Sequence, residues 1–147
     1  MKTSDLILLD TNVLVYNHQE KSELNDRSRA ILKQGFKGLL PLCVCPQVLL
    51  EFYATITNPK RVTNPAPSRE GIEEIEKYLT SRTIQKVYSN QYILKICLEL
   101  LKRYEVKRQE VFDLRLVATM LCNNIKRIYT FNQDDFVKYL ELEVLQP

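Results

Sequence analysis

The sequence predicts an α/β fold with a mostly parallel central sheet that helices cover on both faces. Short apolar runs of strand length alternate along the chain with amphipathic stretches of helix length. Parallel strands need long crossover connections, so this alternation favours a parallel sheet. The 147 residues are 45% hydrophobic and 27% charged, which suffices for one hydrophobic core. We therefore expect a single domain over residues 1–147.

The first expected strand, Leu6–Leu9, ends at the polar residues Asp10, Thr11 and Asn12. Open α/β sheets bind ligands at the carboxyl ends of their strands. An ionised carboxylate beside a buried strand needs compensation by backbone donors, a cation or a metal ion. A simpler reading is that Asp10 caps the short helix expected over Asn12–Tyr16.

Periodicity and helix-breaking residues predict the elements up to residue 88. These are a helix over Arg27–Lys37, a strand over Leu42–Cys45, a helix over Pro46–Ile56, a proline-rich loop over Asn58–Ser68, a following helix with its stripe at Ile72, Ile75 and Leu79, and a short strand over Thr83–Tyr88. In the third helix, Glu51 shares a face with Val48 and Phe52, so we expect it among apolar neighbours.

The remaining elements continue the alternation. They are a helix over Ile93–Tyr104, a helix from Glu110 to Asn123 that carries Asp113 in its first turn, a strand over Arg127–Thr130, a helical Phe136–Leu140 and a last strand over Leu142–Leu145. The strand that ends at Thr130 leads into an acidic turn. We see no internal repeat.

Acidic residues recur where the predicted strands end or the following helices begin. They are Asp10, Glu51, Asp113 and either Asp134 or Asp135. Right-handed crossovers bring these positions to one rim of a parallel sheet. Clustered carboxylates repel one another unless a cation lies between them, and an oxygen-only cluster suits Mg²⁺ or Mn²⁺. The pattern thus indicates metal-assisted hydrolysis of a phosphate ester.

Each of these acids also has a simpler interpretation. Glu51 could form an ion pair with Arg115. Asp113 could interact favourably with the helix dipole at the start of its helix, and Asp135 could be a solvated turn residue. The single histidine, His18, lies in a polar stretch, and we expect it at the surface without a chemical role.

Composition excludes several protein classes. The four cysteines show no zinc-site or disulfide spacing, so we expect free thiols and a reducing cytoplasm. No apolar run reaches the length of a membrane span, and Leu6–Leu9 is too short for a signal-peptide core. The formal charge of +3 permits a nucleic-acid partner without implying one.

Four segments resemble the signatures of the PIN domain, in the order of that family. They are Leu9–Leu14, Leu50–Phe52, Phe112–Ala118 and Thr130–Phe136. The domain is small and looks most like the PIN ribonucleases of the VapC type, which are the toxins of bacterial toxin–antitoxin pairs. This resemblance implies a three-layer α/β/α sandwich, Mg²⁺- or Mn²⁺-dependent cleavage of RNA, homodimerisation and inhibition by an antitoxin protein.

The resemblance also assigns roles to residues. Asp10, Glu51 and Asp113 match the metal-binding acids of the family. Many members have an acid where this chain has Asn132, so the fourth acidic role falls to Asp135. Asp134 is a weaker substitute for this role. Asn132 could still form a hydrogen bond with a metal-bound water. Hydrogen bonds from Thr11, Asn12 and Thr130 would orient the carboxylates.

Two basic pairs are candidate contacts for RNA phosphates. Lys60 and Arg61 lie in the proline-rich loop, and Lys107 and Arg108 precede the helix of Asp113. Both pairs are also ordinary loop residues.

Other functions fit less well. A haloacid-dehalogenase-like phosphatase needs a second aspartate two residues after the first, where this chain has Asn12. A response-regulator receiver would need paired acids there and a late lysine, and neither is evident. Asn132 keeps open a degenerate PIN domain that serves as an RNA-binding or protein-interaction module.

Overall fold

A five-stranded sheet forms the centre of the protein. The computed structural model describes residues 5–147, so residues 1–4 of the expected domain lie outside the described part. The strand order is β3-β2-β1-β4-β5, and every neighbouring pair is parallel. The strands are β1 (Ile7–Leu9), β2 (Leu42–Val44), β3 (Gln85–Lys86), β4 (Arg127–Tyr129) and β5 (Glu143–Leu145).

The central strand β1 is buried on both faces, which explains its uninterrupted apolar sequence. In the register, Leu8 lies opposite Cys43 of β2 on one side and Ile128 of β4 on the other. The chain first builds the sheet outward through β2 and β3, then returns to add β4 and β5 beyond β1. The direction of the connections therefore changes between β1 and β4, the position at which doubly wound sheets bind ligands.

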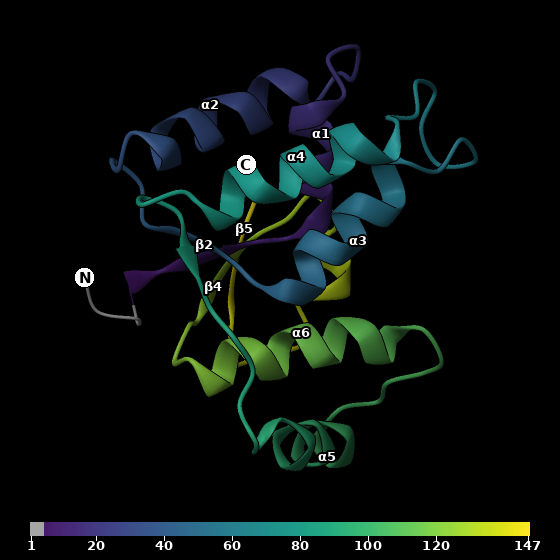
Figure 1. Cartoon of the computed structure of the whole chain (residues 1–147). Helices are drawn as coiled ribbons and strands as arrows, with labels where there is room; N and C mark the ends of the chain where they lie inside the picture. The colour runs from purple at the N-terminus through teal and green to yellow at the C-terminus, as the bar shows by residue number, and fades with distance from the viewer. Residues whose placement is uncertain (1–4) are drawn as a thin grey trace.

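Helices cover the sheet on two sides, as Figure 1 shows. The helices are α1 (Thr11–His18), α2 (Asn25–Phe36), α3 (Pro46–Ile56), α4 (Ser68–Leu79), α5 (Ile93–Arg103) and α6 (Glu110–Cys122). The first four lie on one side, and α6 with α5 packed against it lies on the other. The predicted three-layer α/β/α architecture with a parallel sheet is confirmed.

The prediction of a helix over Phe136–Leu140 is wrong. The backbone makes a short 3₁₀ turn, η2 (Gln133–Asp135), and then further turns before β5. Phe136 and Tyr139 are both buried, and the Tyr139 amide donates to the Phe136 carbonyl at 3.0 Å. Two core side chains three residues apart suggest a helix, but here a compact turn places both rings in the core.

Helix α4 packs tightly against α3 through Gly71. A Cβ atom at this position would lie 2.7 Å from the Tyr53 ring. The close approach sets the position of the first turn of α4, which carries Glu70.

The cysteines match their expected role as free thiols. All four are unpaired, and Cys43 and Cys45 are buried in the core. No helix among residues 5–147 is both long and apolar enough to cross a membrane.

Candidate active site

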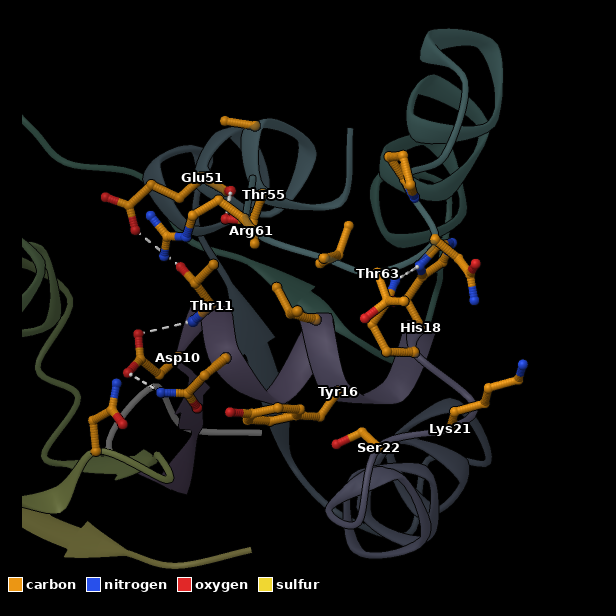
Figure 2. A pocket seen from close by; sticks show the side chains of 18 of the residues that line it. Asp10, Thr11, Tyr16, His18, Lys21, Ser22, Glu51, Thr55, Arg61 and Thr63 are labelled. Atoms are coloured by element: carbon orange, nitrogen blue, oxygen red, sulfur yellow. Dashed lines mark hydrogen bonds between the residues drawn. The ribbon is translucent and has the colours of Figure 1, made fainter. Parts of the chain in front are cut away.

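Four carboxylates from separate parts of the chain line one cleft of about 1080 Å³. Asp10 follows β1, Glu51 lies on α3, Asp113 lies in the first turn of α6 and Asp135 ends η2. The cleft opens beside the carboxyl ends of β1 and β4, so the topology brings these residues together as the sequence suggested. Figure 2 shows Asp10, Thr11 and Glu51 gathered on one side of it.

Asp10 is the most enclosed of the four, with 8% of its surface exposed. Its Oδ1 atom accepts from the Thr11 amide at 2.8 Å, so the helix-capping interpretation also holds. Its Oδ2 atom accepts from the Thr130 hydroxyl at 2.8 Å and from the Asn12 side-chain amide at 3.1 Å. Three donors therefore hold the carboxylate in one orientation.

Asn12 links the Asp10 carboxylate to the end of the neighbouring strand β4. Its amide nitrogen also approaches Thr130 Oγ1 at 3.2 Å, and its Oδ1 atom accepts from the Phe131 amide at 3.1 Å. The Asn132 amide donates to the same Thr130 oxygen at 2.9 Å. The segment after β4 is thus fixed relative to Asp10.

Glu51 is exposed, so the expectation that it lies among apolar neighbours is wrong. Val48 and Phe52 are fully buried, whereas Glu51 lines the cleft. Its Oε2 atom accepts from the Thr11 hydroxyl at 2.9 Å. No ion pair with Arg115 occurs among the described residues.

Gln47 also orients Glu51, and the sequence reasoning missed it. Its side-chain nitrogen donates to Glu51 Oε1 at 3.1 Å and to the Phe112 carbonyl at 2.9 Å. Gln47 therefore links the helix of Glu51 to the first turn of α6, next to Asp113. The four-residue spacing between Gln47 and Glu51 on a helix was the available signal.

The charges of the carboxylates in the cleft raise one another's pKa values. Burial, followed by the charges of Asp135, Asp10 and Glu51, raises the pKa of Asp113 to about 7. Burial is also the largest cause that raises the pKa of Asp10, with smaller contributions from Glu51 and Asp135. Hydrogen bonds from Thr130 and Thr11 act in the opposite direction on Asp10. Such mutual repulsion favours a bound cation.

The structure distinguishes the residues of the acidic turn. Asp135 and Asn132 line the cleft, whereas Asp134 lies outside it. Only Asp135 of the two aspartates is a cause of the raised pKa values at Asp10 and Asp113. Asp135 is thus the acid of this turn that faces the other carboxylates.

Only one of the four candidate basic residues lines the cleft. Arg61 does so, whereas Lys60, Lys107 and Arg108 are not among its described lining residues. The Lys107 side chain pairs with Glu105 at 3.1 Å. Lys21, which the sequence analysis did not single out, also lines the cleft.

His18 lies in the cleft, so the prediction of a plain surface residue is wrong. Its side chain is 13% exposed, and its Nε2 atom lies 3.6 Å from Glu70. Its ring meets Phe52 edge to face, with ring centroids 6.1 Å apart. His18 follows Thr11 by seven residues, which places both on one face of α1, and this spacing was the available signal.

The donor set suits a hydrated divalent cation. The carboxylates offer only oxygen ligands, which hard cations prefer. Among residues 5–147, no three histidine, cysteine, aspartate or glutamate side chains lie close enough to hold one ion directly. Mg²⁺ commonly keeps several waters and binds through one or two carboxylates, so the spacing is compatible with such an ion.

Fold and site together define a small α/β protein with an acidic cleft at the carboxyl ends of β1 and β4, where the direction of the connections changes. The model of the PIN domain family matches residues 7–141, and the chain belongs to this family. The predicted PIN resemblance is therefore confirmed.

Individual relatives agree with this assignment. The chain is 25% identical over 134 residues to Ribonuclease VapC24 of Mycobacterium tuberculosis, a match that covers 91% of each chain. It superposes with a TM-score of 0.70 on VapC20 of Mycobacterium tuberculosis, described as a sarcin-ricin loop cleaving toxin, at 15% identity and over 96% of this chain and 99% of that one. A toxin–antitoxin complex from Klebsiella pneumoniae gives a TM-score of 0.62 at 17% identity, over 96% and 97% of the two chains.

Proposed function

We propose that this protein is a Mg²⁺- or Mn²⁺-dependent endoribonuclease of the VapC type. The observation that carries the proposal is the convergence of Asp10, Glu51, Asp113 and Asp135 in one cleft, with the pKa of Asp113 raised to about 7. The ribonuclease relative, which matches over 91% of both chains, supports RNA as the substrate.

In this proposal one or two of the four carboxylates would bind the ion directly and the others would bind it through its water molecules, while neighbouring residues orient the carboxylates. The bound ion would polarise the scissile phosphate and lower the pKa of a water molecule. Thr130 and Asn12 fix the orientation of Asp10, and Thr11 does the same for Glu51. Asn132 lines the cleft where its side chain is available to a water molecule. No histidine base is required for this chemistry.

The similarity to VapC proteins suggests the biological setting. We propose that the protein is the toxin of a toxin–antitoxin pair, that it forms a homodimer and that an antitoxin protein inhibits it in the cytoplasm. Several structural neighbours are toxin–antitoxin complexes, which supports the antitoxin partner.

A second candidate is a catalytically degenerate PIN domain that binds RNA or a protein. Asn132, an uncharged side chain in the lining of the acidic cleft, favours this candidate. The presence of Asp135 in the same lining opposes it, because a fourth carboxylate is supplied from three residues further along.

The test is cleavage of a mixed pool of structured and single-stranded RNA by the purified protein, with Mg²⁺, with Mn²⁺ and with EDTA. Asp10→Asn and Asp113→Asn are compared with Asp134→Asn, whose carboxylate lies outside the cleft. We expect metal-dependent cleavage by the wild type and by Asp134→Asn only, while circular dichroism shows that all variants are folded. A wild type that binds RNA but cuts none with either metal would support the degenerate module instead.

A further inference from the structure

Lys138 connects the two segments that carry Asp113 and Asp135. Its ammonium group donates to Glu110 Oε2 at 3.1 Å and to the Glu105 carbonyl at 3.2 Å. Glu110 is the first residue of α6, and Asp113 follows it in the same first turn. Lys138 itself lies just beyond the 3₁₀ turn that ends at Asp135. One side chain therefore bridges the helix of Asp113 and the segment of Asp135.

The backbone that carries Lys138 is anchored in the core. Phe136 and Tyr139 are buried, and the Tyr139 amide donates to the Phe136 carbonyl at 3.0 Å. The Leu140 amide donates to the Tyr104 hydroxyl at 3.1 Å. Lys138 thus projects from a fixed segment, which limits the positions that its ammonium group can reach.

Glu110, at the other end of the bridge, is also held in place. Its Oε2 atom accepts from the Lys107 backbone amide at 2.9 Å as well as from Lys138. The hydrogen bond from the Lys107 amide, followed by that from Lys138, lowers the pKa of Glu110. The carboxylate therefore stays ionised opposite the ammonium group, and a hydrogen bond between charged groups is stronger than one between neutral groups.

The charge of Lys138 acts on the acidic cleft although the residue is not among the described lining of that cleft. Burial and the charges of three carboxylates raise the pKa of Asp113, and the charge of Lys138 lowers it. Lys138 is thus near enough to offset part of the repulsion among the acids. A divalent ion could bind between the acids without displacing Lys138.

We propose that Lys138 is a positioning residue of the metal site, which fixes the turn of Asp135 relative to Asp113 through its bridge to the first residue of α6. The inference rests on the proposed metal-dependent function and names a residue that assembles its site. The two carboxylates stand on different elements, so the hydrogen bonds within either element do not set their separation. Lys138 supplies a direct link between those elements.

Lys138 has two effects on a bound ion, and they act in opposite directions. As a bridge it orders the acids before the ion arrives, which lowers the entropic cost of binding. As a positive charge it repels a divalent cation. The carboxylate of Glu110 offsets part of this charge, so the ordering effect is the larger one. Loss of Lys138 should therefore weaken metal binding, whereas a purely repulsive role would make its loss tighten binding.

The experiment compares Lys138→Met and Lys138→Arg with Lys107→Met. Methionine removes the charge and the donor at a similar length, whereas arginine retains both. Lys107 is a matched control, because its ammonium group forms an ion pair with Glu105 on the same loop at 3.1 Å, and its described contacts do not include the acidic turn. Binding of Mn²⁺ is measured by electron paramagnetic resonance, which detects the free ion and needs no cleavage.

A second measurement follows the acidic turn in the metal-free protein. The amides of Asp135 and Phe136 donate to the carbonyls of Asn132 and Gln133 at 3.1 and 3.0 Å. NMR of hydrogen exchange at these two amides in EDTA reports how firmly the turn is held. The amides of β1 in the same spectra report the stability of the whole protein.

We expect Lys138→Met to weaken Mn²⁺ binding about fivefold, a modest factor because the bridge is a partly exposed ion pair. Exchange of the Asp135 and Phe136 amides should accelerate by a similar factor, while exchange in β1 stays unchanged. Lys138→Arg should retain most of the affinity and protection. Lys107→Met should behave as the wild type does.

Glu110→Gln tests the bridge from its other end. It should weaken Mn²⁺ binding in the same direction as Lys138→Met. The double variant should bind Mn²⁺ no more weakly than Lys138→Met alone, because both changes break the same contact. Fully additive losses would show that the two residues act independently and would overturn the bridge.

Three further results would overturn the inference. They are tighter Mn²⁺ binding by Lys138→Met, an effect no larger than that of Lys107→Met, and faster exchange that extends equally to β1. A wild type that binds no Mn²⁺ would refute the proposed metal-dependent function separately. Exchange in EDTA would then still decide whether Lys138 holds the acidic turn.

Discussion

The Thr130 hydroxyl donates a 2.8 Å hydrogen bond to Asp10 Oδ2, across 120 residues of sequence and between the ends of two neighbouring parallel strands. Both residues are buried. The Thr130 hydroxyl oxygen also accepts a hydrogen bond from the Asn132 backbone amide at 2.9 Å. One hydroxyl therefore connects the central strand, the candidate metal-binding carboxylate and the acidic turn.

Thr130→Val should destabilise the protein and reduce its activity. Valine keeps the shape of threonine but removes a donor to a buried carboxylate, which costs about 2 kcal/mol of unfolding free energy. Urea denaturation at pH 7 measures the loss. Thr130→Ser retains the hydroxyl and should keep most of the stability, so equal losses in both variants would contradict the role of this hydrogen bond.

The metal-free protein should lose stability as pH rises from about 4 to about 7. Burial and the neighbouring carboxylates raise the pKa of Asp113 to about 7 in the folded protein. Over this range the folded state binds a proton that the unfolded state has released, so the free energy of unfolding falls with increasing pH. We expect a contribution of about 1–2 kcal/mol, because the partial exposure of Asp113 weakens the effect.

Urea denaturation in EDTA at several pH values tests this dependence. The comparison is with Asp113→Asn, which should lack this component of the slope and should be the more stable of the two at pH 7.5. Saturating Mg²⁺ should also flatten the slope in the wild type, because a bound cation favours the ionised form. If the free energy of unfolding depended on pH equally in Asp113→Asn and in the wild type, the dependence would belong to other titratable groups.

The placement of the acids was predictable because it depends on topology. An apolar run that stops at Asp10 and a helix that begins near Asp113 are visible in the sequence, and parallel strands bring such ends together. Glu51 illustrates the limit of this reasoning. Helical spacing put it on the same face as Val48 and Phe52, but those two side chains are buried and Glu51 is exposed in the cleft.

Contacts between distant loops were not predictable. Lys60 and Arg61 are neighbours with the same charge, and only the turn geometry turns Arg61 into the cleft. His18 is polar and lies in a polar stretch, but packing against Phe52 and the position of Glu70 enclose it. Phe136–Leu140 has the apolar spacing of a helix, and the core accepts the same side chains from a turn.

Gln47→Met should weaken metal activation. Methionine has a similar length but cannot donate to Glu51 or to the Phe112 carbonyl, so it releases both contacts of Gln47. Loss of such orienting partners typically lowers metal affinity or activity by a factor of about 10. The Mg²⁺ concentration for half-maximal cleavage should rise by about that factor. Gln47 is a positioning residue, so kcat at saturating Mg²⁺ should fall much less than in Asp113→Asn.

Asp135→Asn should impair the protein far more than Asp134→Asn, although the two residues are adjacent. Asp135 lines the cleft and helps to raise the pKa of Asp113, whereas Asp134 lies outside the cleft. In cleavage assays with varied Mg²⁺, we expect Asp135→Asn to raise the half-activating concentration at least tenfold and Asp134→Asn to change it less than twofold.

The effect on Asp113 separates a direct electrostatic role of Asp135 from a structural one. Removing the charge of Asp135 should lower the pKa of Asp113 in the metal-free protein, which NMR titration of the Asp113 carboxyl carbon measures. A variant in which the turn has merely shifted would also change the buried environment of Phe136, visible in the aromatic resonances.

Asn132→Asp should act in the opposite direction to Asp135→Asn, since it adds a carboxylate to the same lining and should tighten Mg²⁺ binding. If Asn132→Asp left metal binding unchanged while Asp135→Asn abolished it, the acidic role would belong to Asp135 alone.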